Sequence, residues 1–309
     1  MKIGFLYAGQ GSQVVGMGKS LYDNFQSARE VFDGAKLDFD LRSVCFDGPA
    51  EKLNQTSYTQ PCMVAVAAAA TNVLAEYGVK PDIAAGLSLG EYSALYASGV
   101  LGFQEVLKAV RFRGLAMEEA VKGIKGKMAA VIGLAREELV EICARVSENG
   151  VVEIANYNCP GQMVIGGEAD AVDMAAQLAL EKGAKRVLPL NVSGPFHTSL
   201  LEPASKKLAR YFEDVEFNTS EIPVVFNATA DFLRENQTIP QLLARQVMSP
   251  VYFEDSLRKM EREGVDVMIE IGPGRVLSGF VRKTCKAVKV LAVEDLESLE
   301  SALKALKDF

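Results

Sequence analysis

The stretch Ile83-Ala84-Ala85-Gly86-Leu87-Ser88-Leu89-Gly90-Glu91-Tyr92 decides the fold class of this chain. The short apolar run 83–85 ends at Gly86, which is typical of a buried strand. Helical spacing of apolar residues then runs from Glu91 to about Ala97. The segment therefore predicts a strand that turns sharply at Ser88 and continues as a helix.

The chain before and after this turn has the pattern of an α/β domain. Residues 3–8 form an apolar run that stops at Gly9-Gln10-Gly11, so they predict a buried strand. Residues 58–77 are apolar almost all round, as in a helix buried inside a large domain, and residues 103–121 also have helical spacing. Strands that alternate with helices indicate a parallel sheet.

The stretch from about Lys127 to Leu190 has a different order of elements, β-α-β-β-α-β, which is that of a ferredoxin-like unit. The expected strands are 128–134, 151–155, 162–165 and 186–190, the expected helices are 137–147 and 169–182, and 156–161 is the expected loop between the middle strands. We therefore expect two domains. Residues 1–125 and 192–309 form a large α/β domain of α/β-hydrolase type with a central parallel sheet, and residues 126–191 form the inserted ferredoxin-like βαββαβ subdomain.

The last third of the chain should complete the large domain. We expect helices at 199–212, 241–247, 253–263 and 276–285, and strands at 224–226 and 267–271.

Composition limits the class of protein. Of 309 residues, 49% are hydrophobic and 24% charged, as in soluble globular proteins. The formal charge of −7 argues against nonspecific binding of nucleic acid, which needs a broad basic surface. The longest apolar run, 62–70, is too short to cross a bilayer, and the N-terminal residues lack the apolar region of a signal peptide. We therefore expect a cytoplasmic protein with neither a nucleic-acid nor a membrane partner.

Cysteine and histidine usage argues against a metal site or disulfide framework. Five cysteines lie far apart without a C-x-x-C motif, which indicates reduced thiols. One histidine cannot build a zinc site of the usual kind. We expect no bound metal.

Ser88 lies at the centre of a G-x-S-x-G motif, the spacing of a nucleophile elbow. In an elbow, small flanking residues allow close approach of the chain, and the N–H of the next residue, Leu89, faces a developing oxyanion. A serine hydroxyl needs a base, and imidazole has a suitable pKa. His197 is the only histidine and therefore the only imidazole candidate. From the residues alone, an ordinary turn and an ordinary satisfied histidine remain alternatives.

Several blocks occur in the order seen in malonyl-CoA:acyl-carrier-protein transacylases, and the chain resembles this family from Gly9 to about Arg282. The blocks are Gly9-Gln10-Gly11-Ser12-Gln13, Gly86-Leu87-Ser88-Leu89-Gly90-Glu91-Tyr92, Arg113-Gly114, Asn156-Tyr157-Asn158-Cys159-Pro160-Gly161-Gln162, His197, Arg245-Gln246 and Gly272-Pro273-Gly274.

The resemblance implies a role for each of these residues. Ser88 would accept the acyl group with His197 as its base, and the N–H groups of Gln10 and Leu89 would form the oxyanion hole. Arg113 would bind the free carboxylate of malonyl, because a planar guanidinium can hold a carboxylate through two parallel hydrogen bonds.

Other roles are implied less directly. Arg111 would face elsewhere on its helix. No acidic triad member can be assigned, and an amide or main-chain carbonyl near Gln246 would orient the histidine. Further candidates for the lining of the cleft are Asn156, Asn158, Gln60 and Met117.

Two residues bear on selectivity. The family usually has histidine before the nucleophilic serine, whereas this chain has Leu87, so any hydrogen bond that histidine makes there is in doubt. In related polyketide acyltransferases, a bulky aromatic residue at the position of Phe196 accompanies selectivity for malonyl over methylmalonyl. Phe196 also fits an ordinary packing role.

A modest basic cluster near the C-terminal end of the chain suits either an acidic carrier protein or a solvated face. It consists of Arg282, Lys283, Lys286 and Lys289.

The implied activity is transfer of malonyl from malonyl-CoA to the phosphopantetheine thiol of acyl carrier protein through a malonyl-serine ester, in fatty-acid biosynthesis. No cofactor is expected beyond malonyl-CoA as substrate, and we expect a monomer. The alternatives are an acyltransferase that serves a polyketide synthase, a serine esterase, and a binding module with a degenerate elbow. An α/β-hydrolase esterase places its histidine near the C-terminus, whereas 112 residues follow His197 here.

Overall fold

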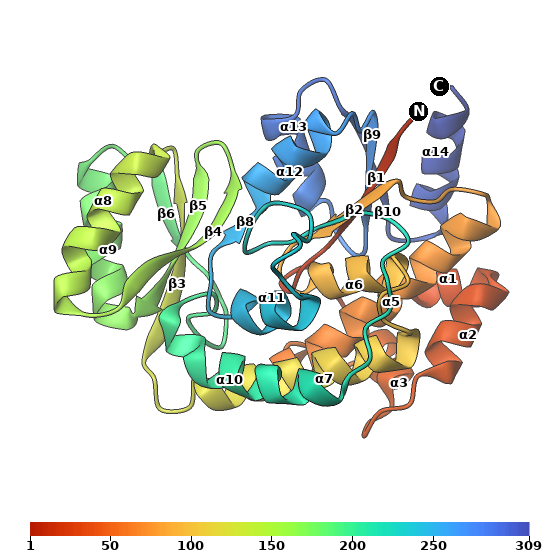
Figure 1. The fold of residues 1–309 in the computed structure, drawn as a ribbon, viewed down its shortest axis with the longest axis horizontal. Helices are drawn as coiled ribbons and strands as arrows, with labels where there is room; N and C mark the ends of the chain where they lie inside the picture. Colours follow the sequence, from red (N-terminus) through yellow and green to blue (C-terminus); the bar gives the residue numbers. More distant parts are fainter. Residues whose placement is uncertain (309) are drawn as a thin grey trace.

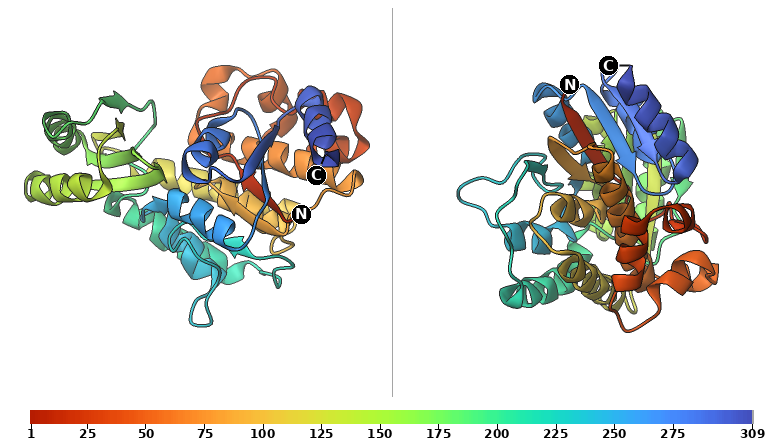
Figure 2. Two further views of the ribbon diagram at one scale, coloured as in Figure 1. Left: turned by 90° about the horizontal axis from the view of Figure 1, so that it is seen from above. Right: turned by 90° about the vertical axis from the view of Figure 1, so that its right-hand side faces the viewer.

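A computed structural model describes residues 1–308 of the chain. It contains two separate five-stranded sheets, and the second projects to one side of the larger helix-covered body (Figures 1 and 2). The expected α/β fold class, with a central parallel sheet and a second, ferredoxin-like sheet, is confirmed.

The central sheet is parallel throughout, with strand order β10-β9-β1-β2-β7. Its strands are β1 (Ile3–Tyr7), β2 (Ile83–Gly86), β7 (Val224–Val225), β9 (Val267–Ile271) and β10 (Lys289–Val293). Tyr7 pairs with Gly86 in the β1–β2 register, so both strands end at the same edge of the sheet. That edge carries the turn at Ser88.

Helices cover both faces of this sheet, because alternate residues of each strand point to opposite sides. Leu6, Ala85 and Met268 belong to one apolar cluster with α12 (Phe253–Arg262) and α13 (Val276–Thr284). Phe5, Tyr7 and Ile269 belong to a second cluster on the other face. This second cluster includes α5 (Thr56–Glu76), α6 (Gly90–Ala97), α7 (Phe103–Ala120) and α14 (Leu296–Lys307).

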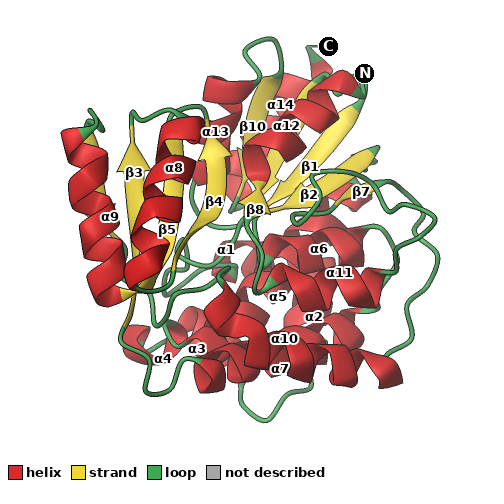
Figure 3. Cartoon of the chain, turned by 60° about the vertical axis from the view of Figure 1, so that its left-hand side comes forward, coloured by secondary structure: helices red, strands yellow, loops and turns green. Residues whose placement is uncertain are grey.

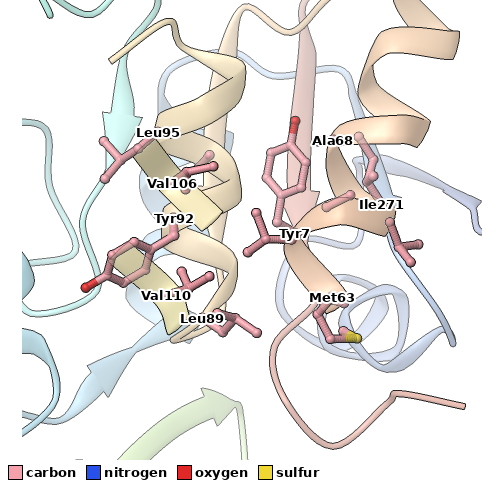
Figure 4. Close-up of a cluster of buried hydrophobic side chains, with 14 of the residues drawn as sticks. Tyr7, Met63, Ala68, Leu89, Tyr92, Leu95, Val106, Val110 and Ile271 are labelled. Atoms are coloured by element: carbon pink, nitrogen blue, oxygen red, sulfur yellow. The ribbon is translucent and has the colours of Figure 1, made fainter. Parts of the chain in front are cut away.

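The second cluster is the main core of the protein. Figure 4 shows Tyr7 of β1 beside Met63 and Ala68 of α5, with Tyr92 and Leu95 of α6 nearby. Helix α5 is buried on nearly all sides, as its apolar sequence predicts. The smaller helices around this core are α1 (Lys19–Asn24), α2 (Gln26–Gly34), α3 (Leu41–Phe46), α4 (Ala50–Leu53), α10 (Glu202–Tyr211) and α11 (Ile239–Gln246).

The second sheet has strand order β6-β3-β5-β4-β8. Its first four strands are β3 (Gly126–Ile132), β4 (Val152–Cys159), β5 (Gln162–Glu168) and β6 (Arg186–Pro189). These four strands are antiparallel to one another and have the strand order of a ferredoxin-like unit, whereas the fifth strand, β8, is parallel to β4. Helices α8 (Arg136–Val146) and α9 (Ala169–Glu181) cover one face (Figure 3). The other face packs against the large domain through Met128, Ala130 and Val164.

The structure corrects the sequence predictions at three places. The segment 156–159 was expected in a loop but continues β4. The pairing of β4 with β5 shifts register at Ile154/Asn156 and at Tyr157/Cys159, and such shifts interrupt the regular alternation by which a strand is recognised in a sequence. The two-residue strand β8 (Val251–Tyr252) lies outside the predicted insert yet pairs with β4. Strand β10 and helix α14 were not predicted, because the basic residues around 289 obscure the apolar pattern.

Among the helices formed by residues 1–308, none combines the length and apolar content that crossing a bilayer requires.

Candidate active site

Ser88 occupies a strained backbone turn between β2 and α6. Its φ of 53° lies in the left-handed region, which residues with a side chain seldom adopt. A Cβ on Gly86 would lie 1.9 Å from the carbonyl carbon of Gly90, and one on Gly90 would lie 2.1 Å from the main-chain oxygen of Tyr7. Both glycines of the motif are therefore required for the close packing of strand, turn and helix, as predicted for an elbow.

The structure brings His197 to Ser88. The Nε2 atom of His197 lies 2.7 Å from Ser88 Oγ, and Nδ1 lies 2.9 Å from the main-chain oxygen of Gln246. A carbonyl oxygen can only accept, so Nδ1 carries the proton and Nε2 presents its lone pair to the serine. Ser88 and His197 thus form a dyad oriented by a main-chain carbonyl.

Burial keeps this imidazole neutral at physiological pH. Burial lowers the pKa of His197 from 6.5 to about 4, and the positive charge of Arg113 adds to this effect. The hydrogen bonds with the main chain of Gln246 and Ser249 act in the opposite direction but are weaker. The neutral form is the one that can take a proton from Ser88.

Arg113 is buried beside both partners, with 1% of its surface exposed. One terminal nitrogen donates to Ser88 Oγ at 3.1 Å and to Gln246 Oε1 at 2.9 Å. Its Nε has no partner among the described residues, and the guanidinium lies 5.5 Å from the centre of the Tyr92 ring. Burial lowers the pKa of Arg113 from its ordinary value. A buried, incompletely paired guanidinium is suited to bind an anionic ligand.

Arg111 has a separate, structural environment, as predicted. Its guanidinium pairs with Asp38 through two hydrogen bonds of 2.9 and 2.6 Å and packs against the rings of Phe39 and Tyr58. It does not line the cavity at Ser88.

Two main-chain donors near Ser88 are free. Within residues 1–308, the N–H groups of Gln10 and Leu89 donate to no protein acceptor. The side chain of Gln10 instead donates to Thr56 Oγ1 at 3.1 Å. Both N–H groups remain candidates for an oxyanion hole.

A cavity of about 290 Å³ opens at Ser88 between the large domain and the second sheet. Of the predicted lining residues, Met117, Phe196, Asn156 and Asn158 line it. Gln60 does not line the cavity: it is buried, with its Nε2 3.5 Å from Sδ of the lining residue Met117. Other lining residues are Gln10, Leu87, Met128, Gln162, Glu270 and Phe280.

Sequence reasoning assigned no role to two buried polar residues beside the elbow. Asn227 Oδ1 accepts from the main-chain N–H of Ser88 at 2.6 Å, and Glu91 Oε2 accepts from the main-chain N–H of Asn227 at 2.5 Å. Burial raises the pKa of Glu91 from 4.5 to about 7, opposed by its hydrogen bonds and by Arg113. A signal was available, since Asn227 follows the strand predicted at 224–226 and polar residues at the carboxyl ends of parallel strands gather at one edge.

The part of the chain that the structure describes contains no group of three or more His, Cys, Asp or Glu side chains that could hold a metal ion.

Comparison with known proteins agrees with this geometry. The model of the acyl transferase domain family matches residues 4–308. The malonyl CoA-acyl carrier protein transacylase of Bacillus subtilis is 46% identical, over 99% of this chain and 98% of its own length. The chain belongs to the malonyl-CoA–acyl carrier protein transacylase family. Its resemblance to that family, inferred above from seven short blocks, is confirmed.

Solved structures of the family have the same fold. The Clostridium perfringens transacylase is 45% identical and superposes with a TM-score of 0.96, with coverage of 100% of this chain and 98% of that one. A malonyl-transacylase solved in complex with a type II polyketide acyl-carrier protein is 38% identical, with a TM-score of 0.95 and coverage of 99% and 100%.

Leu87, the residue before the nucleophilic serine, forms part of the cavity wall. It packs against the apolar cluster that contains Cys159 and Phe280. Its side chain offers no hydrogen bond at this wall, in contrast to the histidine that the resemblance led us to expect there.

Proposed function

We propose that this protein transfers the malonyl group of malonyl-CoA to the phosphopantetheine thiol of acyl carrier protein through a malonyl ester on Ser88. The observation that carries this proposal is the convergence of three side chains: the Ser88 hydroxyl contacts both the neutral base His197 and the buried cation Arg113. The dyad supplies nucleophilic acyl transfer, and the cation selects an acyl group that ends in a carboxylate.

The first half-reaction forms the ester. The carboxylate of malonyl-CoA binds Arg113, and Ser88 Oγ attacks the thioester carbonyl carbon while His197 Nε2 takes the hydroxyl proton. The oxyanion is stabilised by the N–H groups of Gln10 and Leu89. The tetrahedral intermediate then expels the CoA sulfur, which receives the proton from His197, so that CoA leaves as the thiol.

The second half-reaction reverses these roles. His197 takes the proton of the phosphopantetheine thiol, the thiolate attacks the ester carbonyl, and the Ser88 oxygen leaves and recovers the proton. CoA departs before the carrier protein reacts, so the kinetics should be ping-pong. The scheme needs neither a metal nor a cofactor, and we propose that none takes part.

Mass spectrometry of the intact protein tests this function. After treatment with malonyl-CoA, the wild-type protein should gain one malonyl group on Ser88, and Ser88→Ala should gain none. Addition of holo acyl carrier protein should discharge the ester and produce malonyl carrier protein. Rapid hydrolysis of the ester in the absence of carrier, with no transfer in its presence, would instead establish a serine esterase.

A polyketide carrier is the second candidate acceptor, because one relative of the same fold was solved in complex with a type II polyketide acyl-carrier protein. A panel of fatty-acid and polyketide carrier proteins, compared by the rate at which each discharges malonyl-Ser88, separates the two. We propose the fatty-acid carrier, on the basis of full-length similarity to the Bacillus subtilis transacylase.

We also propose that the protein acts as a cytoplasmic monomer. Ser88, His197 and Arg113 meet within a single copy of the chain. The five cysteines are free and buried, which suits a reducing compartment.

A further inference from the structure

We propose that Asn227 is a positioning residue for this reaction: its carboxamide continues the β2–β7 ladder beyond the end of β7 and fixes the main chain of the elbow at Ser88. The inference rests on the proposed function. The hydrogen bonds of Asn227 include none to the hydroxyl of Ser88 or the imidazole of His197, so it would act only through the backbone.

The register of the sheet places Asn227 where a ladder residue would be. Strand β7 pairs with β2 through Val224 opposite Ala84 and Val225 opposite Ala85. Two residues further along, Asn227 falls opposite Leu87. In a parallel ladder, a residue accepts from the N–H that follows its partner and donates to the C=O that precedes it.

The Asn227 side chain makes this pair of bonds in place of its main chain. Its Oδ1 accepts from the N–H of Ser88 at 2.6 Å, and its Nδ2 donates to the C=O of Gly86 at 2.7 Å. A carboxamide is the side chain that offers an acceptor and a donor side by side. The ladder therefore continues along residues 86–88 although β7 has ended.

The main chain of Asn227 is itself fixed from two directions. Its N–H donates to Glu91 Oε2 at 2.5 Å, and its C=O accepts from the N–H of Tyr252 at 3.0 Å. Asn227 is fully buried. Glu91 lies in the first turn of α6, the helix that follows the elbow. Asn227 is therefore hydrogen-bonded both to the elbow, at Ser88, and to the helix that begins there, at Glu91.

The elbow needs such support because Ser88 is held at a positive φ, and a strained backbone persists only where its surroundings determine it. Gln246 Nε2 and Glu91 N fix the C=O of Ser88, at 2.9 and 3.2 Å, whereas Asn227 alone fixes its N–H among the described residues. Rotation of this turn would move Oγ away from His197 and re-aim the N–H of Leu89. A displacement near 1 Å at a reacting group costs on the order of a hundredfold in rate.

Two variants and one control test the proposal. Asn227→Leu removes the carboxamide but fills its volume, and Asn227→Ala removes it and leaves space. Asn218→Ala is the control, because Asn218 precedes the same strand but is exposed, and its side chain donates only to Gly99 O, at 3.3 Å. Each protein is assayed for cooperative thermal unfolding, for the single-turnover rate of Ser88 malonylation, and for kcat and KM.

A positioning role predicts a loss of about 30- to 100-fold in the rate of malonylation and in kcat for both Asn227 variants, with KM for malonyl-CoA within about threefold of wild type. Asn218→Ala should match wild type. A folded Asn227 variant that malonylates Ser88 within about threefold of wild type, or that loses only in KM, overturns the proposal.

Hydrogen exchange of the wild-type protein provides a test that does not depend on the variants. The Ser88 amide should be protected although it lies at the tip of a turn, and exchange as fast as that of an open loop would overturn the proposal. If wild-type protein forms no malonyl-Ser88, the proposed function fails. If wild type reacts and the variants react equally well, only the role of Asn227 fails.

Discussion

The Nδ1 atom of His197 lies 2.9 Å from the main-chain oxygen of Gln246, so a carbonyl dipole orients the base where many serine enzymes use a carboxylate. The carbonyl selects the tautomer that presents Nε2 to Ser88. It supplies little of the negative charge that would favour an imidazolium. Burial and Arg113 meanwhile act against the charged form, and this combination determines how the protein should respond to pH.

We expect the rate of Ser88 malonylation at limiting malonyl-CoA to depend on a group whose pKa lies well below 6.5. His197 must be neutral to act as base, and burial followed by Arg113 lowers its pKa to about 4. The rate should therefore rise with pH through about 4 and change little between pH 6 and 8. Because the chain has one histidine, the imidazole signals in an NMR titration of the wild-type protein report His197 directly. A midpoint near 6.5 in either experiment would contradict the prediction.

The same shift has a consequence for stability. The folded-state pKa of His197 is lower than the unfolded value, so its contribution to the free energy of unfolding is present above pH 6.5 and is lost as the pH falls towards 4. Glu91 acts with the opposite sign, since its pKa is raised from 4.5 to about 7 and its contribution is lost as the pH rises through that value. The free energies of unfolding of wild type and His197→Gln should therefore be compared by urea unfolding at several pH values, because the contribution of Glu91 is present in both proteins and cancels in the difference. The stability difference between the two should change between pH 6.5 and 4, and a constant difference would show that His197 titrates normally.

Arg113→Ala should separate malonyl from acetyl transfer. Loss of the guanidinium removes the charged hydrogen bonds expected for the malonyl carboxylate, at a cost of about 2–3 kcal/mol in transition-state stabilisation. Acetyl-CoA has no carboxylate, so its transfer should be retained or increased. The measurement is kcat/KM for both acyl-CoA substrates.

Arg111→Ala is the matched control, because Arg111 lies on the same helix and pairs with Asp38 instead of lining the cavity. It should leave both activities near wild type. Equal loss of malonyl and acetyl transfer in Arg113→Ala would refute carboxylate binding and indicate that Arg113 serves Ser88 alone.

The elements that carry chemistry could be predicted from sequence because each had a local signal. Gly86 and Gly90 marked the elbow, and the single histidine left one imidazole candidate. The ferredoxin-like order was readable because strands and helices alternate cleanly between 126 and 189.

The residues that were missed depend on relationships between distant segments. Asn227 is conspicuous only once β7 is known to lie beside β2, and strand β8 is recognisable only through its pairing with β4. Gln60 was expected at the cleft, yet its side chain contacts Met117 Sδ and does not line the cavity. Helix rotation and sheet order are set by the packing of the whole core, which local pattern does not encode.

Phe196→Leu should relax selection against a branched acyl group. Phe196 lines the cavity directly before His197, and its ring is buried. A smaller side chain leaves room for one methyl group at the α-carbon, a difference worth about tenfold in selectivity. The ratio of kcat/KM for methylmalonyl-CoA to that for malonyl-CoA should rise accordingly. Phe280→Leu, which alters the cavity wall on α13, is the control and should leave the ratio unchanged, and an equal rise in both variants would show that overall cavity size decides.

Gly86→Ala should destabilise the fold and disable the elbow. The added methyl would lie 1.9 Å from the carbonyl carbon and 2.1 Å from the carbonyl oxygen of Gly90, and main-chain atoms cannot give way as a flexible side chain can. Overpacking of this kind costs about 3 kcal/mol or more, since relief requires β2 and α6 to separate. Urea unfolding should show the loss, and malonylation of Ser88 should fall with it even where the protein remains folded. Gly279→Ala is the control: Gly279 lies within α13 with no atom near its added Cβ, so the change should raise stability by about 0.5–1 kcal/mol through helix propensity. If Gly86→Ala unfolds at the same urea concentration as wild type, the prediction is wrong, because the turn then accommodates the added methyl group without separating β2 from α6.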